Sequence, residues 1–535
     1  MIACTGNNRS LSGETFMKKS KKNLVFQIIV LLGILATMIS CHKNSSQIGN
    51  NIFKLAFSGE KSAAGYDPSK INFIYEHTFL KNIFSPLVEL DSNGNLISGV
   101  AEKYYWKDKE LHFELRKDLK TIDGTPITGR DVELSLKRLM ILSTNPHGNL
   151  KSILCPSIAI KTLDDPCPGI ISFEHKIILR PENKYVFLLP MLTSVDFSII
   201  PQKSLDFKTL KIKDYRNTTG VYYVYGEIDG YKEIKLKANP YHYHYSPKIL
   251  QNVSLVSAGK TALKNSLQLF NENLVDGIST ADLLSAEAQI NLASVNNQAQ
   301  LHKTLGMAVW FVMFTQKGIK RISEENRFIL AKKIKNIFLE KLSGLKAYNP
   351  INQYFLSLGE GAISGEQEKE LVEKINTAKD SLTNIKAIKG EYFMLSDLKE
   401  KVLDSIATLD SRMQFSIGTL FPNLENDYES MPDFYLTGID SSFDEDIGLV
   451  SFAMNMDCFG LGKEKGKKWL DEYVQIENKQ ERIEKLRELH YSALIKGYFF
   501  PLMSSSFAAI IRKGWSFDFS KTQVSLPLWK IQKEN

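Results

Sequence analysis

Residues 83–139 have the sequence IFSPLVELDSNGNLISGVAEKYYWKDKELHFELRKDLKTIDGTPITGRDVELSLKRL, and this stretch decides the fold class. Asn93-Gly94 lies between two short apolar runs, and this dipeptide favours the tight turn of a β-hairpin. Residues 111–115 alternate between apolar and polar side chains, as in a strand with one buried face. Turn residues at 123–126 precede a predicted helix at about 129–139. Short strands and helices in close succession predict an α/β or α+β protein.

The same mixture of strands and helices continues along the rest of the chain. The patterns indicate a strand pair at 221–225 and 233–237 and helices at 323–341 and 476–496. The chain has 535 residues, of which 43% are hydrophobic, so it is long enough for more than one lobe. No internal repeat and no long low-complexity linker interrupts it, and we therefore expect interleaved lobes.

The first 41 residues have the organisation of an export signal. A basic cluster at 18–22 precedes an apolar run at 24–36. Ser40-Cys41 resembles the lipobox of bacterial lipoproteins, which predicts a signal peptide over residues 1–41, lipidation of Cys41 and a membrane anchor. The alternative is an uncleaved N-terminal anchor, because the apolar run is close to the lower length limit for a membrane span. Both interpretations place the chain from residue 42 onward outside the inner membrane.

Two further features of the N-terminus set the expected domain limits. Residues 42–51 are polar and aperiodic, which predicts a tether between the anchor and the folded body. Met17 directly precedes the basic cluster and is a second candidate start, which would make residues 1–16 an upstream extension.

The charge of the chain argues against nucleic acid as a partner. The formal net charge is +7 at pH 7, but the first 41 residues hold five Lys or Arg and one acidic residue. The surplus of about +3 that remains for the rest is small, and no basic stripe with interleaved aromatic residues accompanies it.

The cysteines leave two alternatives open. In an exported protein, Cys155 and Cys167 could close a short proline-rich loop as a disulfide. The other interpretation is that Cys155, Cys167 and Cys458 are buried free thiols. No Cys-x-x-Cys spacing is present, so the cysteines do not predict a metal site.

Motifs for catalysis are weak in this sequence. It contains no phosphate-binding loop, no His-Glu-x-x-His and no Gly-x-Ser-x-Gly. His242 and His244 alternate as two metal ligands on a strand would, but without a third ligand nearby an aromatic patch is favoured. Acidic residues at 440–446 could serve a hydrolase as paired carboxylates, and a solvated loop is the simpler interpretation. An enzyme is therefore the weaker class of function, and we expect no catalytic residues, metal or cofactor.

Several blocks of this sequence resemble family 5 of the bacterial extracellular solute-binding proteins, which includes the oligopeptide- and dipeptide-binding lipoproteins. The matching residues are Phe84–Leu90, Gly99–Glu102 with Trp106, Phe113–Lys117, Asp123–Thr128 with Asp131-Val132, Asn217–Tyr222, Ala238–Tyr243 with Pro247-Lys248, Trp310–Phe314 with Arg327, and Tyr498–Met503. The block Ala238–Tyr243 resembles a turn motif of the family, which accounts for the two histidines without a metal. The blocks at 310–314 and 498–503 correspond to strands of the family.

The resemblance implies an α/β fold of two lobes, with an enlarged first lobe, joined by hinge strands that close over a ligand. The first lobe would take residues 52–304 and 503–535, and the second lobe 305–502. The implied function is capture of oligopeptides or peptide-like ligands for an ABC importer. The implied partners are the ligand, a permease with its ATPase, and the membrane through the lipid anchor. The implied state is a monomer in the periplasm.

The resemblance also points to ligand-binding residues in the second lobe. In the oligopeptide branch, a motif after a glycine supplies the aspartate that meets the ligand's ammonium group, and Gly438–Asp446 corresponds to it. Ser442 stands where that aspartate is expected, so Asp440 or Asp444 would have to supply the carboxylate, because a buried ammonium needs a charged partner. Trp310 and Thr315 are further candidates on the strand that enters the second lobe. The alternatives are a ligand without a free amine, a non-peptide solute bound by an exported sensing protein, or a lipid-anchored hydrolase.

Overall fold

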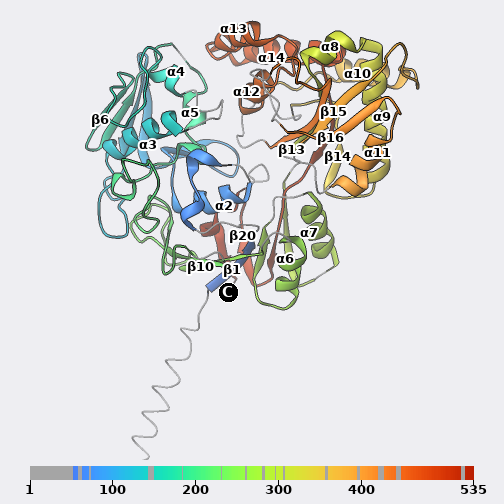
Figure 1. The fold of residues 1–535 in the computed structure, drawn as a ribbon. Coiled ribbons are helices and arrows are strands. Elements are labelled where there is room, and N and C mark those ends of the chain that lie inside the picture. The colour runs from blue at the N-terminus through green and yellow to red at the C-terminus, as the bar shows by residue number, and fades with distance from the viewer. Residues whose placement is uncertain are drawn as a thin grey trace, which may run out of the picture. The chain divides into compact units, whose positions relative to one another are not determined.

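The computed structural model describes most of the chain from residue 52 onward (Figure 1). The described residues are 52–57, 63–71, 74–142, 150–183, 185–229, 232–258, 262–279, 283–295, 297–304, 308–355, 360–393, 398–419, 427–440, 447–519 and 525–534. Residues 1–52 and 53–535 form two separate units, and the fold described here is that of the second. The predicted export signal, with Cys41, lies outside the described residues.

A seven-stranded mixed sheet forms the base of the first lobe. Its order is β12 (Ala299–Lys303), β19 (Ala508–Arg512), β11 (Gly277–Ser279), β1 (Ile52–Phe57), β10 (Asn252–Ser257), β9 (Glu233–Ala238) and β8 (Tyr222–Val224). The antiparallel pair of β8 and β9 confirms the predicted strand pair. Helices α6 (Ala262–Asn271) and α7 (Leu283–Val295) pack on β11 and β19, respectively.

A second part of the first lobe is a four-stranded sheet, to which the segment at 83–139 contributes two strands. Its order is β4 (Ala101–Lys107), β5 (Glu110–Leu115), β7 (Lys176–Leu179) and β6 (Ile170–Phe173). The predicted hairpin, strand and helix are confirmed as β2 (Val88–Leu90) with β3 (Leu96–Ser98), β5, and α3 (Gly129–Leu142). A side chain at Gly129 would collide with the backbone of Phe173, so glycine is needed where α3 meets β6.

The second lobe is built around a six-stranded sheet. Its order is β14 (Tyr348–Pro350), β18 (Phe499–Ser505), β13 (Ala308–Phe314), β17 (Phe434–Asp440), β15 (Ile388–Tyr392) and β16 (Met413–Ile417). All seven residues of β13 are buried, which explains its continuous apolar sequence. The predicted strands at 310–314 and 498–503 are confirmed as β13 and β18.

Helices pack around this sheet, and α9 and α11 lie beside it in Figure 1. The helices of this lobe are α8 (Gln316–Arg321), α9 (Glu324–Leu342), α10 (Gly365–Thr377), α11 (Asp404–Ala407), α12 (Ile447–Asn455), α13 (Lys463–Tyr473) and α14 (Lys479–Ile495). The two long predicted helices are confirmed as α9, capped by Ser323, and α14, capped by Asn478. The second of these starts later than predicted, because Asn478 caps the first turn.

The remaining short elements complete the first lobe. They are α2 (Ile74–Ile83), α4 (Leu150–Leu154), α5 (Leu188–Met191), and the antiparallel pair β20 (Trp515–Phe517) and β21 (Ile531–Lys533). Across the described part of the chain, no helix is both long enough and apolar enough to cross a membrane.

The chain passes between the two large sheets twice, and the two crossings are paired side by side. The strand β12 pairs with β19 in the first lobe, and β13 pairs with β18 in the second. Between them, the Thr304 amide donates to the Phe507 carbonyl at 2.9 Å and the Phe507 amide donates to the Thr304 hydroxyl at 2.7 Å. The return crossing lies between the end of β18 at Ser505 and the start of β19 at Ala508, and the lobe limits expected from the sequence stay predictions.

Candidate functional site

The strand β17 leads to the segment in which the sequence predicts the ligand anchor. Its last residue, Asp440, pairs with Ala308 at the start of β13. The side chain of Asp440 and the whole of residues 441–446 lie outside the described part of the structure. The roles of Asp440, Ser442 and Asp444 therefore stay predictions.

Trp310 lies at the same end of the sheet as Asp440. Its ring packs on Gly438 of the neighbouring strand, where an added side chain would collide with the indole. Its indole nitrogen donates to the Ser505 hydroxyl on β18 at 3.1 Å, and only 6% of the residue is exposed. Trp310 therefore joins β17 to β18, and the glycine of the predicted binding motif leaves room for it.

Thr315 lies at the opposite end of β13 and caps α8. Its hydroxyl accepts a hydrogen bond from the Gly318 amide at 3.1 Å and donates to the Pro432 carbonyl at 2.7 Å. The structure therefore separates the two candidates that the sequence grouped together, because Trp310 lies at the Asp440 end of the sheet and Thr315 at the other. Contact of either residue with a ligand stays a prediction.

The His-Tyr segment at 242–244 forms a buried hydrogen-bond network in the first lobe. His244 donates to Glu89 at 2.8 Å, the Tyr243 hydroxyl also bonds Glu89, and His242 bonds the Ser85 hydroxyl at 3.0 Å. Burial alone would raise the pKa of Glu89, but the bonds from His244 and Tyr243 outweigh it and lower the pKa to about 2. The two histidines thus serve the packing of this lobe, and the residues that the structure describes contain no cluster of three potential metal ligands.

Cys155 and Cys167 are joined as a disulfide, with their Cα atoms 5.4 Å apart. The sequence leaves open whether these cysteines form a disulfide or stay free thiols, and the structure contains the disulfide. Cys458 is a buried free thiol. The bridge holds the loop between α4 and β6 at one end of the four-stranded sheet.

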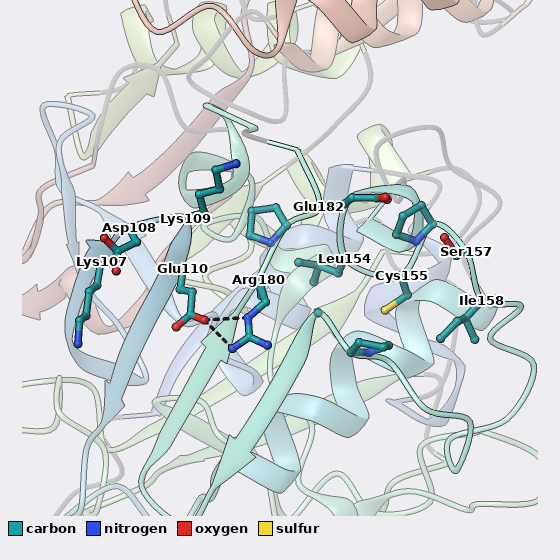
Figure 2. A pocket seen from close by; sticks show the side chains of 14 residues that line it. Lys107, Asp108, Lys109, Glu110, Leu154, Cys155, Ser157, Ile158, Arg180 and Glu182 are labelled. Carbon is teal, nitrogen blue, oxygen red and sulfur yellow. Dashed lines mark hydrogen bonds and ion pairs between the residues drawn. The ribbon is translucent and has the colours of Figure 1, made fainter.

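A cavity of about 720 Å³ opens beside this loop (Figure 2). The lining residues are Lys107, Asp108, Lys109, Glu110, Leu154, Cys155, Pro156, Ser157, Ile158, Pro168, Gly169, Arg180, Pro181 and Glu182. Glu110 pairs with Arg180 at 2.6 Å, and the other charges are equally balanced between basic and acidic side chains. The cavity includes none of Trp310, Thr315 and Asp440, and its balanced charge favours no class of ligand.

A contact that the sequence did not predict joins the end of the four-stranded sheet to the second lobe. The Val186 amide donates to the Val474 carbonyl at 3.0 Å, and the rings of Phe187 and Tyr473 stack with centroids 5.7 Å apart. Apolar residues of this kind are expected in any core, so no sequence signal distinguishes Phe187.

Comparisons with known proteins agree with this architecture. No family model matches the chain. Of the curated proteins, the periplasmic oligopeptide-binding protein OppA of Escherichia coli is 40% identical over 73 residues, which cover 14% of this chain and 13% of OppA. The periplasmic murein peptide-binding protein MppA of Escherichia coli is 33% identical over 78 residues, 14% of each protein. The matched segments are thus a small part of these relatives.

Solved structures match over almost the whole chain. The binding protein AgaA of A. tumefaciens R10, in complex with agropinic acid, has a TM-score of 0.70 at 17% identity and covers 91% of this chain and 99% of AgaA. Haemophilus influenzae OppA, in complex with the peptide RPPGFSPFR, has a TM-score of 0.67 at 15% identity. The match covers 90% of this chain and 99% of that OppA. The chain is therefore a two-lobed protein with the fold of the periplasmic binding proteins.

The local matches to OppA and MppA and the structural neighbours fit the motifs in the sequence, and membership of family 5 of the extracellular solute-binding proteins stays a prediction.

Proposed function

We propose that this protein is the extracytoplasmic solute-binding component of an ABC importer, which captures peptides or peptide-like ligands between its two lobes. The observation that carries the proposal is the double crossing at Thr304 and Phe507, in a fold shared with proteins whose names record peptide binding. Two adjacent strand crossings allow one lobe to rotate on the other, and a ligand that contacts both lobes favours the closed form.

The protein acts by binding and release, without catalysis. The local relatives are named as binding proteins, and a periplasmic location follows from the same relationship. Lipidation of Cys41 would hold the protein at the membrane through the tether at 42–51, beside the permease and ATPase that receive the ligand. A monomer suffices for this cycle, because both walls of the proposed site come from one chain.

Peptides are the proposed ligands, and the second lobe is the proposed anchor for their charged end. An extended peptide offers backbone donors and acceptors that both lobes can pair with, as an added strand does. Asp440 or Asp444 would supply the carboxylate for the ligand ammonium, since Ser442 has no charge.

A non-peptide solute is the second candidate, and Ser442 is the observation that favours it. A ligand without a free amine needs no carboxylate at that position, and the fold also holds agropinic acid in AgaA. The hydrolase alternative differs from both, because it requires turnover that Asp444→Asn abolishes.

Native mass spectrometry of the full chain, purified from a bacterial envelope, tests the proposal. The expected result is a set of co-purifying short peptides that partial unfolding releases. One defined non-peptide mass would move the function to the second candidate. Absence of any bound mass, together with no thermal shift from a library of short peptides, would contradict the receptor function itself.

A further inference from the structure

Phe187 of the first lobe is buried and contacts residues of the second lobe. The residue follows β7 and immediately precedes α5, and only 2% of its surface is exposed. Its ring stacks on Tyr473 at the end of α13, with an angle of 26° between the planes. The guanidinium of Arg482 on α14 lies 5.3 Å from the centre of the same ring. The Val186 amide bonds the Val474 carbonyl alongside.

The second lobe holds the receiving surface in place with its own contacts. Trp469 stacks on Tyr473 with ring centroids 4.8 Å apart, so Phe187 is the third ring of a stack that runs from one lobe to the other. Arg482 is fixed by Glu360, with bonds of 3.1 and 3.4 Å, and by the Ile476 carbonyl at 3.0 Å. A pre-positioned aromatic face and guanidinium make a specific site for one aromatic side chain.

The contact at Phe187 differs from the contacts beside the strand crossings. The Ala347 amide donates to Glu287 at 2.7 Å, and Lys303 donates to the Lys346 carbonyl at 2.7 Å. These bonds run from Glu287 on α7 and Lys303 on β12 to the residues just before β14, which pairs with the crossing strand β18. Rotation about the crossings therefore moves these atoms little. Phe187 enters from the separate four-stranded sheet, so separation of the lobes there would expose an apolar ring and an apolar receiving face to water.

We propose that Phe187, with Tyr473 and Arg482, is a clasp that stabilises the closed arrangement of the lobes and thereby sets the apparent affinity for ligand. The proposal rests on the proposed function, because closure matters for ligands captured between the lobes. A ligand that binds only the closed form has an apparent dissociation constant equal to the intrinsic constant divided by the closed fraction. A weaker clasp lowers that fraction and therefore weakens binding without any change in the ligand's own contacts.

Hydrogen exchange of the full chain in detergent tests the clasp without a ligand. In Phe187→Ala, residues 469–476 and the Val186 amide should exchange about tenfold faster than in the unchanged protein, because the receiving face is uncovered. Phe173→Ala is the control, since Phe173 is a phenylalanine at the end of β6 in the same lobe, with 53% of its surface exposed. Equal exchange in Phe187→Ala and the unchanged protein would overturn the proposal.

A cross-link provides a second measurement that does not depend on removing the ring. Val186→Cys with Val474→Cys places two thiols on backbones joined by the 3.0 Å hydrogen bond. The clasp predicts that this pair forms a disulfide under mild oxidation in the ligand-free protein, as identified by peptide mapping. Failure to form it in ligand-free protein would contradict a closed clasp.

Calorimetry with a mixture of tri-, tetra- and penta-alanine links the clasp to capture. Phe187→Ala should raise the dissociation constant about tenfold, while Phe187→Tyr, which keeps the ring, should stay close to the unchanged protein. Unchanged affinity in Phe187→Ala with normal peptide binding would refute the clasp and leave the proposed function standing. Faster exchange in Phe187→Ala with no peptide binding in any variant would refute peptide capture and leave the clasp standing.

Discussion

Two junctions between the lobes, the strand crossings and the contact at Phe187, are built from different chemistry. At the crossings, backbone strands pair with one another and Thr304 bonds Phe507 in both directions. At Phe187, one backbone bond accompanies a stack of side chains. Backbone pairing is available to almost any residue, whereas a ring stack depends on the residues that form it. We therefore expect the crossings to determine the stability of the fold. We expect the Phe187 contact to determine the balance between the open and closed arrangements of the lobes.

Phe507→Pro should have the largest effect, because it breaks the crossing itself. Proline removes the amide that donates to Thr304 at 2.7 Å, and the substitution also removes a ring that is 7% exposed. We expect a loss of at least about 3 kcal/mol in the free energy of unfolding, measured by urea denaturation. Phe507→Leu, which keeps the amide and most of the burial, should lose far less. Equal stability of the two variants would show that the backbone bond is unimportant.

Trp310→Ala should have the next largest effect, since Trp310 ties β17 to the strand that leads into the return crossing. Loss of this buried ring should destabilise the protein by about 3–5 kcal/mol. Trp310→Phe keeps a ring against Gly438 but loses the bond to Ser505, and should lose only about 1–2 kcal/mol. Thermal unfolding of both variants measures the difference, and similar losses would mean that the hydrogen bond dominates.

Acid should weaken the first lobe at a site that belongs to neither junction. The pKa of Glu89 is lowered to about 2, so its ionised form stabilises the folded state above pH 4.5, and this contribution is lost as the pH falls from 4.5 to 2. We expect about 3 kcal/mol to disappear over that window in urea denaturation. Glu89→Gln should remove this dependence, while Glu102→Gln, at an exposed position, should keep it. The same acid sensitivity in both variants would exclude Glu89 as its source.

Arg482→Gln should have the smallest effect, confined to the side-chain junction. The cation–π contact with Phe187 is worth about 0.5–1 kcal/mol, so peptide affinity should fall by about two- to fivefold with little loss of stability. Arg487→Gln is the matched control on the same helix, because Arg487 bonds the Ala362 carbonyl in its own lobe. Calorimetry on the two variants measures the difference, and equal affinities would remove Arg482 from the clasp.

The sequence predicts local secondary structure better than it predicts long-range contacts between side chains. The hairpin at Asn93-Gly94, the strand β5 and the capped helices α3 and α9 follow from local patterns, since turn residues, caps and periodicity act within a few residues. Trp310 and Thr315 were chosen by their place on one strand, and only the fold reveals that each is engaged with partners more than 100 residues away.

By itself, the sequence determined the α/β class, the order of the strands and helices and the resemblance to family 5, because these depend on local periodicity and short motifs. It left the pairing of Cys155 with Cys167 open, and tertiary structure joined them by bringing the two ends of the loop to 5.4 Å. Tertiary structure alone decided that Thr304 meets Phe507 and that Phe187 meets Tyr473. The physical reason is that an amide or a phenyl ring has the same local preferences whatever its partner, and only the packing of the whole chain selects that partner.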